Sequence, residues 1–351
     1  YLNFDQQRIY DHMIRKYVKS GIGHHNSLIL YRVLHLLKIK VLRILRKLDR
    51  RTYSQNYRTD YSIKSYSQKN HQVFFGYYDI SPFSRDDQFL LAMHAHSENK
   101  PPIADSRLKV GYYLLNGDHT KFEEVGSTTT WCWQQGCRLQ WCPTDSSHTI
   151  LYNRLVNGKY GSVVQDIFSK KILHEYSKPI YSIDNNGMWG LSLNFSRLNR
   201  LRPGYGYINL LDKTDGQLQP DGDGIWRISM QNDSVELLFS ISEIVEIEPL
   251  DSMAGAEHYF NHIMFNPSGD RFLFFHLWIN QEQRFSRLIT CNLDGSEPYV
   301  LINEGHVSHY NWKSDNEIIA YATHSDHGMC YYLYKDKSKI RKIIGDDVLT
   351  R

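Results

Sequence analysis

A plan of short strands around a recurrent turn constrains the fold of this chain more than any other feature. From about residue 71 onward, four strand candidates follow one another in each of five consecutive units. The first connection of every unit is rich in Asp, Asn, Ser and Gly, which favour tight turns. These turns lie at 84–87, 144–147, 184–187, 266–270 and 313–316. Tandem four-stranded units with one turn register predict an all-β fold, a β-propeller of four-stranded blades.

The first strand of each unit is predicted to be the innermost strand of a blade. These strands are predicted at 78–83, 138–142, 180–184, 262–266 and 309–312. The third strand of the third unit is predicted at 207–211 together with 224–230. Five blades are readable in a propeller domain at 71–351, and the ring could hold up to seven if the chain is truncated. The 25 Tyr among the 351 residues agree with this fold, because aromatic side chains favour strands.

Residues 1–70 form a basic segment ahead of this domain. They hold 15 Lys and Arg against 4 Asp and Glu, whereas the rest of the chain holds 26 against 34. Leucines, isoleucines and valines at a 3–4 spacing predict an amphipathic helix at 26–51. Such a helix binds an anionic membrane surface or a protein partner, or packs on the body or on a second copy. No nucleic acid is expected, because no aromatic residues interleave the charges.

The rest of the composition limits where such a chain works. No apolar run reaches the roughly 18 residues that a membrane helix needs. The five cysteines are an odd number without a usual zinc spacing, so we expect reduced thiols. These features predict a cytoplasmic protein, with the periphery of the inner membrane as its place if the basic helix binds lipid.

The antiparallel plan also predicts where a site would form. The start of the first strand and the end of the second lie on one face, because the two strands run in opposite directions. Most histidines of the repeats fall at these places. The residues predicted there to bind substrate are Tyr77, His94, Trp133, Gln134, Gln135, Arg154 and Trp278. Those predicted to carry chemistry are His258, His262, His276, His306, His309, Arg197, Arg202 and Tyr205.

Two kinds of chemistry suit such side chains. Converging neutral His and Gln side chains bind a first-row divalent metal. A His or Tyr base can instead remove the proton next to a carboxylate that an arginine or a metal has neutralised. That reaction is β-elimination on a polysaccharide containing uronic acids. A glycosidase needs two spaced carboxylates, and only Glu257 and Asp326 are obvious on this face.

Two segments resemble a known family. Residues 257–262 read Glu-His-Tyr-Phe-Asn-His, with Phe-Asn-Pro-Ser-Gly following at 265–269, and residues 305–312 read Gly-His-Val-Ser-His-Tyr-Asn-Trp. They resemble the repeats of the oligogalacturonate lyase family over roughly 75–351. The resemblance implies a bacterial β-propeller polysaccharide lyase, with manganese held by His and Gln, a separate His base and an Arg nearby.

The chain also departs from that family. The expected metal-binding Gln has no clear match in the fifth unit, and the basic helix has no counterpart. The segments 131–136 and 202–207 look more like lyase-related propellers of bacterial surface-polysaccharide gene sets. A divergent member with another glycan substrate, or one that has lost catalysis, fits these departures.

The resemblance and the predicted face together assign roles. We expect His258 or His262 to be the base or a metal ligand. A divalent metal, manganese first, is expected on His276, His306 and His309, and no nucleotide cofactor. Arg197 or Arg202 would hold the carboxylate, and Tyr205 would protonate the leaving oxygen. The alternative is a non-catalytic propeller that binds glycan or protein in a surface-polysaccharide assembly.

Overall fold

The computed structural model describes residues 60–67, 71–96 and 100–345. The chain divides into two compact units, Tyr1–Ile63 and Lys64–Arg351, and all strands of the described residues belong to the second. The helix predicted at 26–51 lies outside the described residues. Within the described part, no helix is long and apolar enough to cross a membrane.

Five antiparallel sheets follow one another along the chain, and in each the four strands pair in sequence order. Blade 1 contains β1 (His71–Phe74), β2 (Phe89–His96), β3 (Leu108–Leu114) and β4 (Glu123–Thr128). Blade 2 contains β5 (Gln140–Trp141), β6 (Thr149–Val156), β7 (Lys159–Asp166) and β8 (Ile172–Tyr176). Blade 3 contains β9 (Ser182–Ile183), β10 (Trp189–Ser192), β11 (Gly224–Ser229) and β12 (Val235–Ser240).

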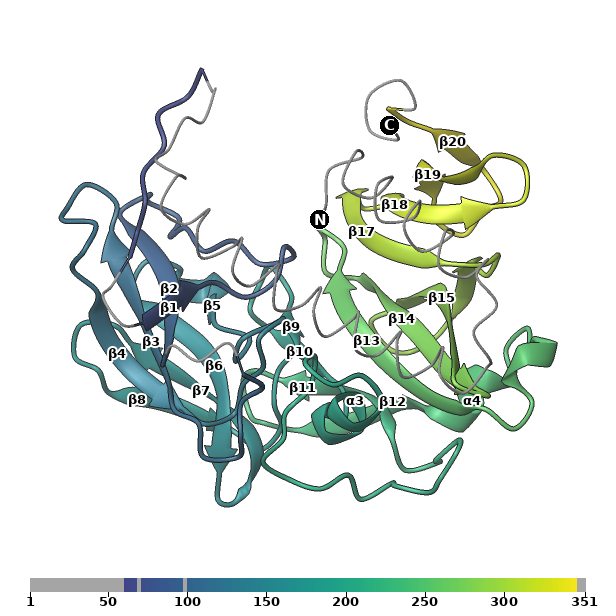
Figure 1. The fold of residues 1–351 in the computed structure, drawn as a ribbon, viewed down its shortest axis with the longest axis horizontal. Coiled ribbons are helices and arrows are strands. Elements are labelled where there is room, and N and C mark those ends of the chain that lie inside the picture. The colour runs from purple at the N-terminus through teal and green to yellow at the C-terminus, as the bar shows by residue number, and fades with distance from the viewer. Residues whose placement is uncertain (1–59, 68–70, 97–99, 346–351) are drawn as a thin grey trace, which may run out of the picture. The chain divides into compact units, whose positions relative to one another are not determined.

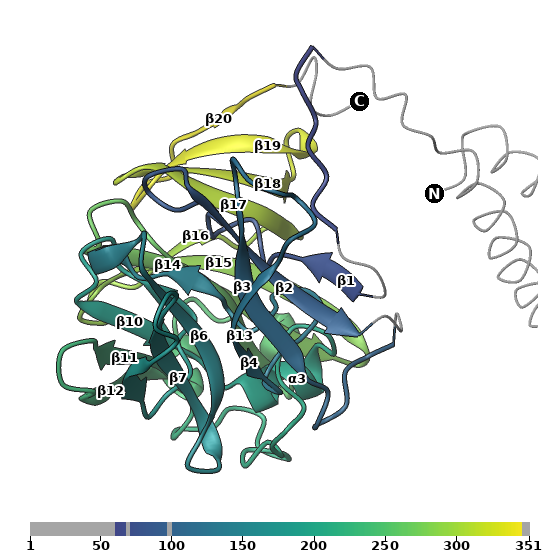
Figure 2. The ribbon, with the colours of Figure 1, turned by 90° about the vertical axis from the view of Figure 1, so that its left-hand side faces the viewer.

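The last two blades have the longest strands. Blade 4 contains β13 (Glu257–Phe265), β14 (Arg271–Asn280), β15 (Gln283–Asn292) and β16 (Tyr299–Ile302). Blade 5 contains β17 (Val307–Ser314), β18 (Glu317–His324), β19 (Gly328–Lys335) and β20 (Arg341–Ile343). The five sheets are the blades of a β-propeller, as the repeats predict (Figures 1 and 2).

The turn after the first strand is built in the same way in three blades. The side chains of Ser84, Asp184 and Asn266 each accept two hydrogen bonds from backbone N–H groups three to five residues ahead. Gly269 in one of these turns has φ 78°, a conformation that glycine adopts without strain. The shared turn chemistry therefore reflects one local structure, repeated from blade to blade.

The core lies between neighbouring blades, so both faces of most blades are buried. One apolar cluster joins blades 1 and 2, and includes Met93 and Ile150. A second joins blades 2 and 3, and the largest spans blades 3 to 5. Residues 271–278 of β14 are buried without a break, which explains why this segment is aromatic rather than alternating.

Two expectations about strands are wrong. In blade 1, Phe74 pairs with Met93 and Phe83 bridges to Leu90, so residues 75–82 leave the sheet between these two contacts. We call residues 75–82 the blade 1 excursion. The segment 207–211, predicted as part of a strand, lies outside the sheet, and the third strand of blade 3 is β11 alone.

Short helices connect some of the strands. The polar segment after β10 begins as helix α3 (Phe195–Leu201), because the Asn194 side chain accepts from the N–H groups of Ser196 and Arg197 at its start. Helix α4 (Ile241–Val245) follows β12 and has a capping box formed by Ser240 and Glu243. Two 3-10 turns lie at Pro143–Asp145 and Asp251–Met253.

Candidate functional site

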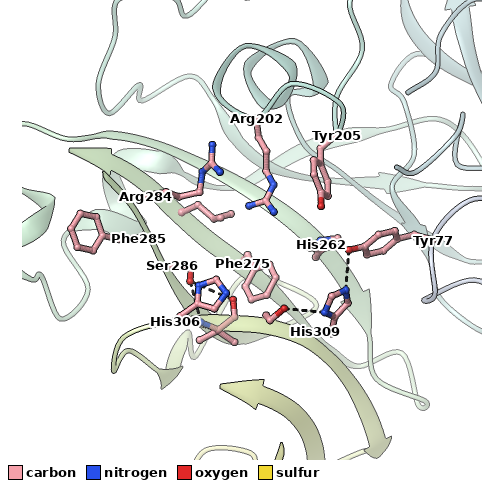
Figure 3. Close-up of a pocket in the computed structure, with 13 residues that line it drawn as sticks. Tyr77, Arg202, Tyr205, His262, Phe275, Arg284, Phe285, Ser286, His306 and His309 are labelled. Carbon is pink, nitrogen blue, oxygen red and sulfur yellow. Dashed lines mark hydrogen bonds between the residues drawn. The ribbon is translucent and has the colours of Figure 1, made fainter. Parts of the chain in front are cut away.

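A pocket of about 260 Å³ gathers residues from blades 1, 4 and 5 and from the loop after α3. Figure 3 shows its side chains. Its polar lining residues are Tyr77, Arg202, Tyr205, His262, Arg284, Ser286, His306, Ser308 and His309. Six of these were predicted from the sequence as site residues: Tyr77, Arg202, Tyr205, His262, His306 and His309.

His262 reaches the pocket because β13 bulges at this residue. Asn261 pairs with Phe275 and Met264 with Leu273, so two residues of β13 oppose one of β14. His262 has φ 50°, which is uncommon for a residue other than glycine. Bulges often re-aim a side chain beside a functional site. The strained backbone is therefore the local cause of the position of this imidazole.

The hydrogen bonds around His262 define which of its nitrogens carries the proton. The Tyr181 hydroxyl donates to Asn261 Oδ1 over 3.3 Å and lies 3.2 Å from His262 Nδ1. Because the Tyr181 proton is already used, its oxygen accepts from Nδ1–H. Nε2 is then the nitrogen with a free lone pair, and the ring can act as a base through it.

The charge state of His262 follows from its surroundings. Burial, and then the nearby charges of Arg138 and Arg202, hold the pKa of His262 well below its ordinary value. Its ring also stacks on Tyr77, with ring centres 4.7 Å apart. The imidazole is thus neutral at neutral pH, and it is a weaker base than an exposed histidine.

The blade 1 excursion places Tyr77 in the pocket. Its hydroxyl lies 3.4 Å from His309 Nε2, and the next residue, Tyr78, accepts a hydrogen bond from the backbone N–H of Tyr310. Asp79 then pairs with Arg138 of the segment before β5, at 2.8 and 3.2 Å. This excursion therefore connects blade 1 to blades 2 and 5 and lies against His262 of blade 4.

Two arginines supply positive charge. Arg202 lies over the ring of Tyr205 at 4.3 Å, and Arg284 donates to the backbone oxygen of Leu201. Neither forms an ion pair with a carboxylate in the described part of the chain. Figure 3 shows both guanidinium groups on one side of the pocket, opposite His306 and His309. This side of the pocket therefore presents hydrogen-bond donors and positive charge.

The opposite side is formed by the start of β17. Ser308 and His309 form a hydrogen bond between Oγ and Nδ1 at 2.9 Å, while His306 is exposed. Ser286 of β15 accepts from the N–H of Val307. This side offers hydroxyl and imidazole groups that suit the hydroxyls of a polar ligand.

Three residues predicted to carry chemistry instead form hydrogen bonds in the interior of the fold. The guanidinium of Arg197 is buried and donates to four backbone oxygens, including that of His258 at 2.7 Å. His258 Nδ1 lies 2.8 Å from His276 Nε2, and both imidazoles are fully buried. Arg197, His258 and His276 therefore do not line the pocket, because their polar atoms bond within blades 3 and 4.

A buried chain of hydrogen bonds runs through these two histidines. Arg287 Nε donates to His276 Nδ1 at 2.9 Å, so His276 carries its proton on Nε2 and donates to His258. His258 Nε2 then faces the backbone oxygen of Met253. Burial, more than any other cause, lowers the pKa of His258 to about 4. Both rings are neutral structural links.

The residues predicted to bind substrate are mostly outside the pocket. His94 is buried against Phe122 and bonds the Tyr113 hydroxyl at 2.9 Å. Trp278 is also buried and donates to Ser252. Gln135 lies under the site and donates to Asn261. Three more lie outside the pocket lining. Trp133 is half-buried and donates to the backbone of Lys100. Arg154 is half-buried and Gln134 is exposed.

The expected metal ligands do not converge. His276 is committed to the buried chain, whereas His306 and His309 lie at the pocket. Among the described residues, no group of three or more His, Cys, Asp or Glu is placed to hold a metal ion. The residues therefore do not fit the expected manganese, and no reaction step is assigned to it.

Sequence reasoning missed three polar residues of the pocket lining, Arg284, Ser286 and Ser308, and the ion pair of Asp79 and Arg138 beside it. The position of Arg138 in its predicted strand could have marked it. Arg138 lies four residues before Cys142, where the innermost strand predicted for the second unit ends. His262 likewise lies four residues before Asn266, the end of the strand predicted for the fourth unit. Arg284 carries no such signal, because it lies beside an exposed hairpin turn.

Comparison with known proteins gives distant structural likenesses and no family. No protein-family model matches the chain, and no curated protein matches it. TolB from Acinetobacter baumannii is 12% identical, with a TM-score of 0.37, over 69% of this chain and 49% of that protein. A putative TolB from Agrobacterium tumefaciens is 14% identical, with a TM-score of 0.35, over 67% and 68%.

A peptidase gives a similar result. The acylaminoacyl peptidase of Pyrococcus horikoshii is 15% identical, with a TM-score of 0.40, over 74% of this chain and 38% of that protein. The chain thus spans about half the length of the Acinetobacter TolB that it matches. None of these three structures is named as an oligogalacturonate lyase, the family that the two segments resemble.

Proposed function

We propose that the pocket binds an acidic glycan containing uronic acids, and that Arg202 and Arg284 hold its carboxylate. One observation carries the proposal: two guanidinium groups line one cavity and pair with no carboxylate in the described part of the protein. A guanidinium presents several N–H donors in a plane that matches a carboxylate. The hydroxyls and imidazoles across the pocket would bind the sugar hydroxyls.

The same pocket supports β-elimination as its reaction. His262 Nε2 removes the proton on the carbon next to the carboxylate, and the electron pair forms a carbon–carbon double bond as the adjacent carbon–oxygen bond breaks. Tyr205 donates its proton to the departing oxygen. The arginines favour the first step, because they stabilise the negative charge that grows on the carboxylate.

The competing candidate is a non-catalytic propeller that binds the same glycan. The lowered pKa of His262, caused mainly by burial, favours this candidate, because a weakly basic imidazole abstracts protons poorly. Both candidates use the arginines in the same way. They differ only in whether the bound glycan is then cleaved.

The test is an absorbance assay on a panel of uronic-acid polysaccharides, with added manganese and with EDTA. Elimination creates a double bond conjugated to the carboxylate, which absorbs in the ultraviolet. We expect a rise that persists in EDTA and falls by about 10²-fold or more in His262→Gln. The matched control is His148→Gln, an exposed histidine of blade 2 outside the pocket, which should behave as the unmodified protein.

Calorimetric binding of the same glycans separates the two candidates. Binding without a rise in absorbance would favour the non-catalytic propeller. A rise that disappears in EDTA would restore the metal and contradict a mechanism in which His262 and the arginines act alone. Neither binding nor absorbance change, with Arg202→Gln equal to the unmodified protein throughout, would contradict the proposed function.

A further inference from the structure

The outer edge of blade 2 exposes large apolar side chains. Its last strand, β8, pairs only with β7 and lies at the outer margin of the blade (Figure 1). Ile172 and Leu173 of this strand are 41% and 56% exposed, and Phe168 in the turn before it is 54% exposed. Exposed apolar residues on an edge strand favour contact with another chain, and proteins usually protect such edges. This edge therefore needs a partner or an explanation.

Leu173 is an exception among the equivalent residues of the other blades. In each of blades 1 to 4, the pairing of the last two strands skips one residue of the outer strand: Val125, Leu173, Leu238 and Leu301. Val125 and Leu301 are buried, and Leu238 packs against the core, whereas Leu173 is more than half exposed. The exposure of Leu173 is therefore a property of this edge and not of the common blade plan.

Two opposite charges flank Leu173 at equal distances along the chain. Lys171 precedes it by two residues and Glu175 follows it by two; both are exposed, and neither is in an ion pair with another described residue. When two copies approach antiparallel about a two-fold axis at Leu173, Lys171 of each copy lies opposite Glu175 of the other. The axis creates this ion pair twice and brings the two Leu173 side chains together. The edge is thus complementary to itself in charge and in apolar character.

We propose that residues 168–175 form a self-association surface, through which two copies of this chain meet edge to edge. The occupant is a second copy because the two-fold arrangement satisfies both free charges and covers the apolar side chains at once. Side chains carry the contact, since the irregular pairing at Leu173 interrupts a regular ladder between the copies. A contact of one short edge is small, so we expect a weak dimer with a Kd in the micromolar range. This surface lies outside the pocket lining, and the inference does not depend on the proposed function.

The test is sedimentation equilibrium of the full chain between about 1 and 200 µM. We expect the Kd of the dimer to rise about tenfold in Lys171→Glu and in Glu175→Lys, because each change places like charges opposite each other twice. The variant that carries both changes should return to within about threefold of the unmodified Kd, since the ion pairs are restored with the charges exchanged. Leu173→Ser should weaken the dimer as well. Val235→Glu, at a 39% exposed position in the outer strand of blade 3, is the matched control and should leave the Kd unchanged.

The outcomes that would overturn the inference are distinct. An unmodified protein that stays monomeric up to about 200 µM would exclude a second copy as the occupant and leave this edge to a different protein. A dimer that neither single charge reversal weakens would place the contact elsewhere on the molecule. Single losses that the double exchange does not repair would contradict the two-fold register at Leu173. Thermal unfolding midpoints equal to that of the unmodified protein show that each variant is folded, as expected for changes at exposed positions.

Discussion

His262 depends on two neighbours for the position of its proton. Tyr181 accepts from Nδ1–H only because its own proton is donated to Asn261. Tyr181 and Asn261, which do not line the pocket, therefore leave Nε2 free to act as a base or to bind a ligand. A histidine in the same bulge without this arrangement would distribute its proton between both nitrogens.

At the residue scale, we expect Tyr181→Phe to disturb both stability and the histidine tautomer. The change leaves Nδ1–H of His262 and Oδ1 of Asn261 without this partner, which costs about 1–3 kcal/mol of unfolding free energy. Urea denaturation measures the loss, and nitrogen-15 NMR of the imidazole reports the tautomer. An unchanged tautomer with unchanged stability would contradict this order of hydrogen bonds.

Individual residues also show how far sequence reasoning reaches. The strand pattern placed His258, His262, His306 and His309 at strand starts, but such a pattern gives a position along a strand and not the depth of a side chain. His258 is buried because Arg287 and the backbone of Met253 complete a chain around it. Those partners come from other elements, so no local pattern could reveal them.

At the element scale, the blade 1 excursion is the feature that organises the site. Residues 75–82 leave the sheet and contact other blades, and the Asp79–Arg138 ion pair fixes them to blade 2. Both side chains are almost fully buried, at 5% and 1% exposure. Removing one partner of such a pair lowers the stability of the fold, because the other charge is then buried without compensation.

We expect Asp79→Asn to lower the unfolding free energy by about 3–5 kcal/mol, because Arg138 loses its only ion-pair partner among the described residues. Denaturant titration measures the change. The matched control is Lys313→Ala, which breaks an exposed pair with Glu317 and should cost less than about 1 kcal/mol. Similar losses in the two variants would show that the excursion is not held by this ion pair.

Elements differ in how well the sequence predicts them. The turn residues Ser84, Asp184 and Asn266 repeat because each turn needs a side-chain acceptor, and they define the blades. The excursion has no such mark, since residues 78–83 also look like a strand. Helix α3 is similarly obscured, because only its Asn194 cap distinguishes it from a polar loop.

At the scale of the whole molecule, buried histidines make the fold sensitive to acid. Burial lowers the pKa of His94 and of His258 to about 4, and lowers the pKa values of His262 and His276 well below the ordinary value. The unfolded chain binds these protons near pH 6.5 and the folded protein does not, since about 6.5 is the ordinary pKa of histidine. The contribution of these neutral rings to the unfolding free energy is therefore present above about pH 6.5 and is lost as the pH falls towards 4.

We expect the unfolding free energy to fall on the order of 2 kcal/mol for each of His94 and His258 between about pH 6.5 and 4, and to fall further because of His262 and His276. Urea midpoints across this range measure the slope. His94→Phe keeps a ring against Phe122 but removes one titrating group, so its slope should be shallower. A flat profile for the unmodified protein would contradict the neutral, buried state of these rings.

The contacts of the excursion also bear on the order in which the protein folds. Tyr77 and Tyr78 meet His309 and Tyr310 across 232 residues of chain. Contacts between such distant positions carry a large loop-closure entropy, whereas each blade closes through neighbouring strands. The blades can therefore form early, and the pocket is completed only when the first and fifth blades meet. A growing chain would carry its first four blades before it could bind any ligand there.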